Sequence, residues 1–314
     1  MSNRIAVVAV GGNALIKDSN HISAADQYAA LRETCEHIVR LISAGWHVAI
    51  GHGNGPQVGF ALRRSELAAS ELPEEPLDVC GASTQGWIGY FLQQNLCNSL
   101  RAVGSDRYPV SVITQVEVDP ADPAFQNPSK PIGAFMDREL AMRRRAEGWA
   151  VMEDAGRGWR RVVPSPMPRR IVEQATIAAL IASGAVVIAA GGGGIPVVRD
   201  DSGALRGVAA VIDKDLASAF LANTIGAELF VISTGVEKVA LNYGKPGQVW
   251  LDQLTLEQAQ RYLDEGVHFA RGSMAPKIQA AIRYLEHGGA HAVITNTENI
   301  QRALAGETGT HITR

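Results

Sequence analysis

Cysteine is scarce in this chain, with three residues among 314: Cys35, Cys80 and Cys97. The count is odd and no two of them form a Cys-x-x-Cys pair, which argues against a disulfide framework and a zinc ribbon. We therefore expect small buried thiols in a reducing compartment. The start of the sequence also lacks the basic, apolar and cleavage segments of a secretory signal, so we expect a cytoplasmic protein.

Excess charge of either sign is also missing. A formal net charge of −3 argues against a nucleic-acid partner held by a broad basic face. Residues 177–198 carry no charge and reach the length of about 20 residues that a membrane span requires. Gly184, the glycines at 191–194 and Pro196 interrupt this stretch, so we predict no membrane partner.

Hydrophobic residues are plentiful, at 46%, which excludes a disordered chain and provides for a large core. The length allows two domains or one large α/β unit. Lysine, in contrast, is rare among the 29 basic residues. The six lysines are Lys17, Lys130, Lys214, Lys238, Lys245 and Lys277.

Short β-branched segments alternate with helical patterns along the chain. Strands are predicted at 5–10, 47–50, 110–113, 186–190, 229–233 and 292–295. Helices are predicted after Ser23, and at 173–183, 255–265 and 276–287. Ser23 and Asp26 resemble a capping box at the first of these helices, and Gly45 would end it. The alternation predicts an α/β fold with a mainly parallel sheet that binds ligands at the carboxyl ends of its strands. The proline-rich segment from about 119 to 168 differs and predicts a small protruding lid.

Three glycine-rich loops follow predicted strands, at 11–13, 53–55 and 191–194. Glycine lets backbone N–H groups approach an anion closely, so three such loops at one sheet edge favour an anionic ligand. The P-loop pattern, the dinucleotide-binding pattern and the Gly-x-Ser-x-Gly pattern are all absent. His52 lies within the second loop, where it could touch a ligand.

Three lysines occupy similar contexts in or near loops that contain glycine or proline. Lys130 lies in the suspected lid, Lys214 in Asp213-Lys214-Asp215, and Lys277 just after a proline. A lysine at a helix start opposes the helix dipole unless an anion lies there. Phosphoryl transfer needs compact positive charges around the moving group, which these lysines would supply. We assign an organising role to Asp213.

At this point the residues resemble the carbamate kinases of the amino acid kinase superfamily. The resemblance runs through nearly the whole chain, in order. Its stretches are 7–15 (VVAVGGNAL), 51–59 (GHGNGPQVG), 81–90 (GASTQGWIGY), 128–133 (PSKPIG), 154–168 (DAGRGWRRVVPSPMP), 189–197 (AAGGGGIPV), 210–218 (AVIDKDLAS) and 268–281 (HFARGSMAPKIQAA).

This resemblance implies an open αβα sandwich with a small protruding subdomain. Residues 1–208 would bind carbamate or carbamoyl phosphate, with the lid at about 119–168, and 209–314 would bind the nucleotide. The implied enzyme is a phosphotransferase with a carboxyl-type acceptor that interconverts ATP plus carbamate and ADP plus carbamoyl phosphate. Mg²⁺ would be carried by ATP or ADP, without a metal site of the protein's own. The resemblance also implies a homodimer. It implies that the reaction runs in the direction of ATP formation, at the end of arginine or purine-derived nitrogen catabolism.

The resemblance also implies roles for individual residues. The substrate loops would be formed by Gly11, Gly12, Asn13, Gly53, Asn54 and Gly55. The catalytic groups would be Lys130, Lys214 and Lys277, together with Asp213 as the aspartate that orients those lysines. The nucleotide would contact Lys214, Ser233, Thr234, Gly235, Tyr243, Met274, Pro276 and Lys277.

Two departures and two alternatives accompany this interpretation. Ala9 and Val10 stand where acetylglutamate and aspartate kinases carry a lysine, so Lys130 is the candidate for that charge. Thr84 replaces a common serine of the family and keeps its hydroxyl. One alternative function is another acyl-phosphate-forming amino acid kinase, whose larger substrate needs a partner for its carboxylate. The other is a non-catalytic nucleotide-binding homologue.

Overall fold

Eight strands form the central sheet of the computed structural model, which describes residues 4–16, 18, 20–154, 158–270 and 272–314. In spatial order they are β15 (Gln253–Thr255), β17 (Thr310–Thr313), β16 (His291–Asn296), β12 (Leu229–Thr234), β1 (Ile5–Val10), β2 (His47–His52), β9 (Val186–Ile188) and β3 (Pro109–Ser111). All neighbouring pairs are parallel except β16 with β17. The prediction of a mainly parallel sheet is confirmed, and six of the strands overlap the predicted segments.

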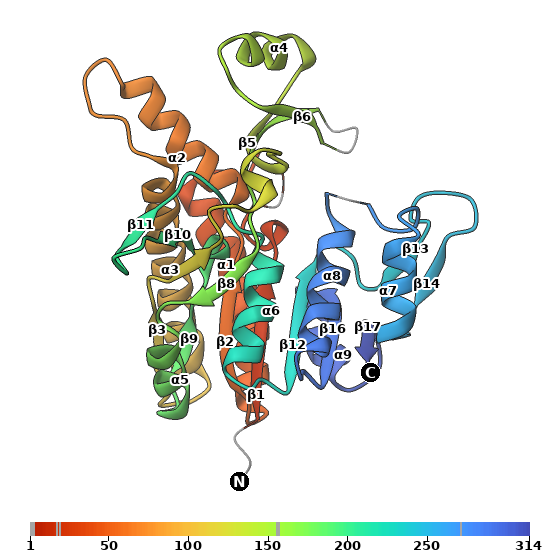
Figure 1. Cartoon of the computed structure of the whole chain (residues 1–314). Coiled ribbons are helices and arrows are strands. Elements are labelled where there is room, and N and C mark those ends of the chain that lie inside the picture. The colour runs from red at the N-terminus through yellow and green to blue at the C-terminus, as the bar shows by residue number, and fades with distance from the viewer. Residues whose placement is uncertain (1–3, 17, 19, 155–157, 271) are drawn as a thin grey trace.

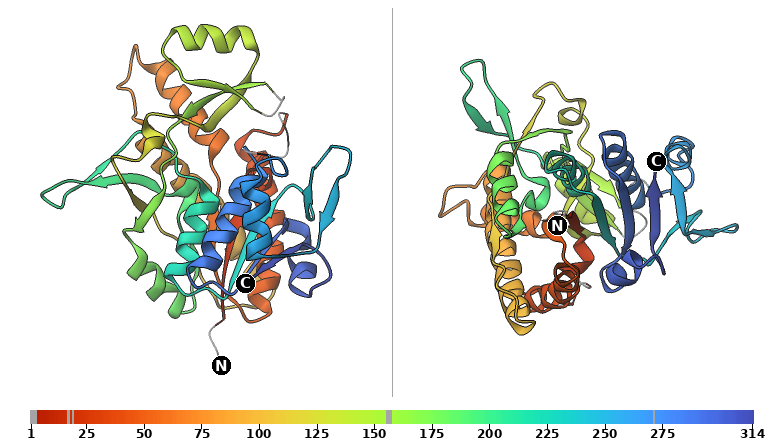
Figure 2. Two further views of the ribbon diagram at one scale, coloured as in Figure 1. Left: turned by 45° about the vertical axis from the view of Figure 1, so that its right-hand side comes forward. Right: turned by 90° about the horizontal axis from the view of Figure 1, so that it is seen from below.

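Helices cover both faces of this sheet, as Figures 1 and 2 show. One face packs on α1 (Ala24–Ser43), α3 (Leu77–Ala102) and α9 (Ile300–Leu304). The other packs on α5 (Gln174–Ala182), α6 (Lys214–Thr224), α7 (Leu256–Asp264) and α8 (Met274–Glu286). Along β1 the side chains alternate, since Val7 and Ala9 belong to one core while Val8 and Val10 belong to the other. This arrangement is the αβα sandwich that the resemblance implied.

The first predicted helix begins as its sequence indicates. Ser23 and Asp26 form a reciprocal capping box at the start of α1, and Gly45 follows its end with a φ of +91°. The longest helix, α3, was missing from the predictions, because Gly81, Gly86 and Gly89 interrupt its pattern. Gly89 allows α3 to approach β3, since a Cβ there would lie 2.2 Å from the Ser111 hydroxyl.

Two smaller sheets accompany the central one, and the projecting one of them is formed by the proline-rich part of the chain. The second sheet has the order β11 (Leu205–Gly207), β10 (Ile195–Arg199), β4 (Gln115–Val118) and β8 (Pro168–Ile171). The projecting sheet consists of β5 (Lys130–Met136), β7 (Trp159–Val163) and β6 (Val151–Glu153). It carries α4 (Arg138–Ala146) and stands above the carboxyl ends of the central strands in Figure 1. We call β5, β6, β7 and α4 the lid.

The remaining elements are short or peripheral. They are α2 (Gly55–Ala68), the hairpin of β13 (Val239–Leu241) and β14 (Val249–Leu251), and the 3₁₀ turns η1 (Gly12–Ala14), η2 (Pro123–Phe125), η3 (Gly191–Gly193) and η4 (Thr297–Asn299). Within the described ranges, no helix combines the length and the apolar character needed to cross a membrane. All three cysteines are free thiols, but Cys97 is exposed, so the expectation of buried thiols is wrong for that residue.

Candidate active site

The three glycine loops converge at the carboxyl ends of β1, β2 and β9. The N–H of Gly53 donates to the Val10 carbonyl at 3.1 Å, which joins the first two loops. A Cβ on Gly11 would lie 2.8 Å from the Ser233 carbonyl oxygen, so the first loop also touches the end of β12. Only glycine permits this approach of backbone to backbone.

The third loop packs against the second loop and against the segment that precedes α6. A Cβ on Gly192 would lie 2.2 Å from the Asn54 side-chain nitrogen, and one on Gly193 would lie 2.2 Å from the Ile212 carbonyl oxygen. Both glycines have positive φ, +65° and +93°, so a side chain would add strain as well as a clash. The turn formed by these two glycines therefore contacts Asn54 on one side and the backbone next to Asp213 on the other.

Two of the singled-out lysines share one carboxylate at this edge. Lys214 donates to Asp215 Oδ1 at 2.5 Å, and Lys277 donates to Asp215 Oδ2 at 2.9 Å. The stem of Lys214 passes over the second loop, where its Cδ would lie 3.2 Å from a Cβ on Gly53. Asp215 therefore joins α6 to α8 directly beside the glycine loops.

Burial and charge shift the protonation of this triad. Burial lowers the pKa of Lys214 to about 8, although the neighbouring Asp215 carboxylate opposes that shift. Burial by itself would raise the pKa of Asp215, but the two ammonium groups outweigh it and hold that pKa well below its ordinary value. Burial works against the charged form of Lys277 as well, yet Asp215 raises the pKa of that lysine. Near neutral pH both lysines are cationic.

Lys130 reaches the same place from the lid. It donates to Asp213 Oδ2 at 2.5 Å across 83 positions of sequence. The other oxygen, Oδ1, caps α6 by accepting from the N–H groups of Asp215 and Leu216 at 2.8 and 3.3 Å. Although burial opposes ionisation, Lys130 keeps the pKa of Asp213 below its ordinary value.

Two aspartates therefore orient the lysines, whereas the sequence interpretation gave this role to Asp213 alone. Asp213 was expected to orient all three lysines, whereas the structure pairs it with Lys130. Asp215 holds Lys214 and Lys277, whereas the sequence favoured Asp213 of this acidic pair for the organising role. Its position beside Lys214 was a signal, but its contact with Lys277 joins residues 62 positions apart.

Two lid residues were also missed by the sequence analysis. Asp154 and Arg160 form a buried ion pair, with 3.3 Å between Oδ2 and Nη1. Arg160 Nη2 lies 3.9 Å from the Cβ position of Gly55 at the start of α2, and Asp154 Oδ1 lies 3.7 Å from that of Gly272 before α8. We call Lys130, Lys214 and Lys277, together with Asp213 and Asp215, the lysine cluster. The lid therefore meets both sides of this cluster. Residues 155–157 of the motif that carries this pair are outside the described residues.

The expected nucleotide-contact residues occupy different places. Ser233 and Thr234 end β12, and the Ser233 hydroxyl shares a hydrogen bond with Thr297 at 2.7 Å. Met274 begins α8, two residues earlier than predicted. Gly235 follows β12, Pro276 lies in the first turn of α8, and Tyr243 is 61% exposed beside the β13–β14 hairpin, where its ring faces Trp250. No contact of Tyr243 with the lysine cluster is seen in the described part of the chain.

The remaining positions of interest are two loop residues and the three lysines to which no role was assigned. Asn13 lies in η1, and His52 is buried, with its Nδ1 3.0 Å from the Gly53 carbonyl oxygen. Lys238 pairs with the exposed carboxylate of Asp252. Lys245 lies exposed in a turn, and Lys17 is outside the described residues.

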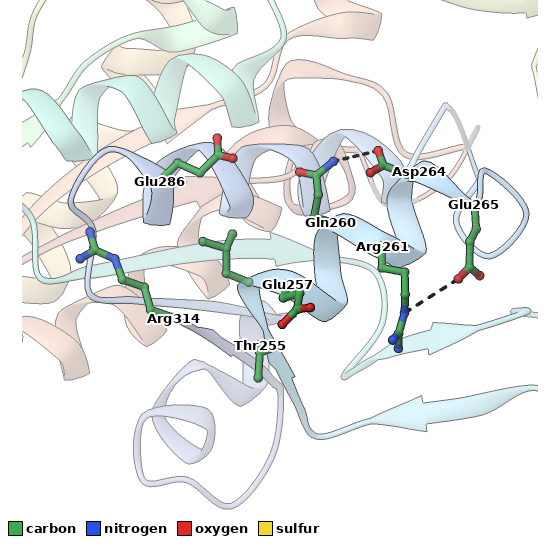
Figure 3. A pocket seen from close by; sticks show the side chains of 9 residues that line it. Thr255, Glu257, Gln260, Arg261, Asp264, Glu265, Glu286 and Arg314 are labelled. Carbon is green, nitrogen blue, oxygen red and sulfur yellow. Dashed lines mark hydrogen bonds and ion pairs between the residues drawn. The ribbon is translucent and has the colours of Figure 1, made fainter.

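A groove elsewhere on the molecule shares no lining residue with the lysine cluster. It lies between α7 and the carboxyl end of α8, where Glu286 is at the opposite end of the helix from Lys277 (Figure 3). Several of its polar side chains are already paired, with Arg261 beside Glu265 and the Gln260 amide donating to Asp264. An anionic ligand would bind more favourably at the lysine cluster than in this groove, because three cations face two carboxylates there.

Comparisons with known proteins agree with this geometry. A model of the amino acid kinase family matches residues 4–296. The carbamate kinase of Pyrococcus furiosus is 48% identical over 99% of both chains, and the carbamate kinase-like protein YahI of Escherichia coli is 49% identical over 98% of both. Two solved structures of carbamate kinase from Giardia lamblia each cover 99% of both chains. The one bound to citric acid has a TM-score of 0.94 at 39% identity, and the one bound to AMP-PNP has 0.89 at 40%.

Proposed function

The chain belongs to the amino acid kinase family, among the carbamate kinases, and on that premise we propose how its lysine cluster carries out the reaction. The reaction is reversible phosphoryl transfer between carbamoyl phosphate and ADP, giving carbamate and ATP. The bond from phosphorus to the carbamoyl oxygen breaks while a bond from phosphorus to a terminal ADP oxygen forms. The observation that carries the proposal is the meeting of Lys130, Lys214 and Lys277 beside three glycine loops.

Catalysis in this site rests on charge and position. The moving phosphoryl group carries negative charge on its oxygens, and pre-oriented ammonium groups stabilise it without reorganising. Lys214 and Lys277 would contact the phosphoryl group and the nucleotide phosphates, since one carboxylate fixes both. Lys130, which extends from the lid, would neutralise negative charge on the carbamoyl group. No side chain needs to form a covalent intermediate.

The two substrates would bind to different parts of the chain. The N-terminal part, 1–208, would hold the carbamoyl group through the glycine loops, and 209–314 would hold the nucleotide. Mg²⁺ would enter as part of MgADP or MgATP. The structure of the Giardia carbamate kinase bound to AMP-PNP supports a nucleotide site of this kind in that relative.

A coupled assay tests the reaction directly. Purified protein supplied with carbamoyl phosphate and MgADP should form ATP, and the reverse assay with carbamate and MgATP should form ADP. A panel with acetylglutamate and aspartate separates this enzyme from other acyl-phosphate-forming kinases. Well-folded protein that binds nucleotide but turns over none of these acids would support the non-catalytic homologue instead.

The cellular setting is part of the proposal. We place the protein in the cytoplasm, where exposed thiols such as that of Cys97 stay reduced. There it would run toward ATP at the end of arginine or purine-derived nitrogen catabolism. Genes that neighbour its own, encoding enzymes that produce carbamoyl phosphate, would support that direction.

A further inference from the structure

The buried face of α3 carries two polar side chains that contact glycine loops, Thr84 the second loop and Gln85 the third. Thr84 is 0% exposed and Gln85 is 3% exposed. Each makes hydrogen bonds with residues far away in the sequence, Thr84 with Asn54 and Gln85 with Thr114 and Gly191. Neither belongs to the lysine cluster or to the loops themselves.

Thr84 sets the direction of the Asn54 side chain. Its hydroxyl donates to the Gly81 carbonyl within α3 at 2.7 Å, so its lone pairs remain available to accept. Asn54 Nδ2 donates to that hydroxyl oxygen at 2.7 Å. Gly192 covers the same amide, because a Cβ there would meet its nitrogen at 2.2 Å. The Asn54 amide is thus held by one hydrogen bond and one close packing contact.

Gln85 holds the third glycine loop. Its Nε2 donates to the carbonyls of Gly191 and Thr114 at 2.9 and 3.1 Å, and its Oε1 accepts from the Thr114 N–H at 2.9 Å. Thr114 in turn accepts from the N–H of Ala190 through its hydroxyl at 2.9 Å. All the polar atoms of the Gln85 amide are therefore engaged at a buried position.

The backbone at this point needs such support. Ala190 has a φ of +52°, a left-handed conformation that costs about 1 kcal/mol or more for a residue with a Cβ. Strained conformations persist only where surrounding contacts over-determine them. Gln85 and Thr114 provide those contacts directly before the loop turns toward Asn54.

We propose that Thr84 and Gln85 are positioning residues for phosphoryl transfer, an inference that rests on the proposed function. Thr84 orients the Asn54 amide toward the bound carbamoyl group, and Gln85 fixes the backbone of the 191–194 loop. Both act on the carbamoyl side, whereas Lys214 and Lys277 lie in the nucleotide part. A change at either position should therefore affect carbamoyl phosphate more than ADP.

Thr84 offers a matched pair of variants. Thr84→Val keeps the shape and removes the hydroxyl, while Thr84→Ser keeps the hydroxyl. Thr84→Val should lower kcat/KM for carbamoyl phosphate by roughly 10- to 100-fold, as displacement of a reacting group by about 1 Å does. The KM for ADP and the affinity for AMP-PNP should stay within about twofold, and Thr84→Ser should resemble the wild type. A purely structural role predicts equal losses for both substrates, and that result would overturn the proposal, as would an impaired Thr84→Ser.

Gln85→Glu provides a second variant should Thr84→Val fail to fold. Ionised Glu keeps the acceptor for Thr114 but turns an oxygen without a proton toward two carbonyls. Protonation restores one donor, so the activity of the variant relative to wild type should rise as the pH is lowered. A pH-independent ratio would contradict the proposal. Wild-type protein is assayed first, because its failure to make ATP refutes the proposed function, whereas normal wild-type turnover with unaltered variants refutes only the positioning role.

Discussion

At the scale of single residues, the protonation of Lys214 stands out. The proposed mechanism requires its ammonium on the phosphoryl group, yet burial lowers its pKa to about 8 from an ordinary 10.5. Asp215, Lys277 and Asp213 face it and contribute to that balance. The free enzyme therefore loses a cation just above physiological pH.

This leads to a prediction about pH dependence. The kcat/KM for carbamoyl phosphate should fall as the pH rises through about 8, because Lys214 becomes neutral. Lys214→Arg should remove this descending limb, whatever its absolute rate, since arginine stays protonated. Between pH 8 and 10.5 the unfolded chain holds a proton that the folded chain has released, so this group makes the free energy of unfolding rise with pH. Denaturant titrations over that window would separate loss of the proton from loss of the fold.

Loss of a catalytic ammonium gives a second prediction. Lys130→Ala and Lys214→Ala should each reduce kcat/KM on the order of 10²-fold or more, as removal of one electrostatic group commonly does. Lys245→Ala is the control, because that lysine lies exposed in a turn. Steady-state kinetics with carbamoyl phosphate and MgADP measure all three. Wild-type rates in the first two variants would contradict the roles proposed for them.

At the scale of elements, the sequence predicted what is encoded locally. The strand and glycine loop at 5–12 is readable because β-branched residues and glycines are neighbours, and the capping box at Ser23 is equally local. The pairs Lys130–Asp213 and Asp215–Lys277 join residues 83 and 62 positions apart, so only the folded chain brings them together. The helix α3 was missed because three glycines interrupt its pattern, and only Gly89 among them is explained by a close tertiary contact, with Ser111.

The packing of the lid on α2 is a further element-scale feature. A Cβ on Gly59 would lie 2.2 Å from the backbone of Gly133 in β5, and both neighbours are backbone atoms. Gly59→Ala must therefore push β5 away, and Lys130 begins that strand. We expect kcat/KM for carbamoyl phosphate to fall roughly 10- to 100-fold, because Lys130 is displaced.

The same substitution should also lower stability, since overpacking typically costs about 1–3 kcal/mol. Arg64→Ala, on an exposed position of the same helix, is the control. AMP-PNP binding measured by calorimetry should remain unchanged in Gly59→Ala. Unaltered kinetics in that variant would show that the lid tolerates the shift and that Lys130 does not depend on this contact.

At the scale of the whole molecule, β3 is the last strand at one edge of the central sheet, and α3 covers it there, since the Ser111 N–H donates to Gln93 Oε1 at 3.1 Å. The helix α3 lies along this edge and carries exposed apolar side chains. The exposed apolar residues on and after α3 are Val79, Tyr90, Val103, Tyr108 and Ile113, between 41% and 74% exposed. Exposed apolar surface of this kind is typical of interfaces.

We therefore expect the homodimer to form through α3 and β3. Light scattering should give about twice the mass of one chain, and Tyr90→Asp should shift the equilibrium toward monomers because it buries a charge in the interface. Leu67→Asp is a matched control, since Leu67 is 65% exposed on α2 and outside this edge. Tyr90 lies on the opposite side of α3 from the buried Thr84 and Gln85, so a monomeric Tyr90→Asp protein with intact turnover would show that each subunit contains a complete site. A wild-type protein that is monomeric at every concentration would refute the dimer, and a dimer unaffected by Tyr90→Asp would place the interface elsewhere.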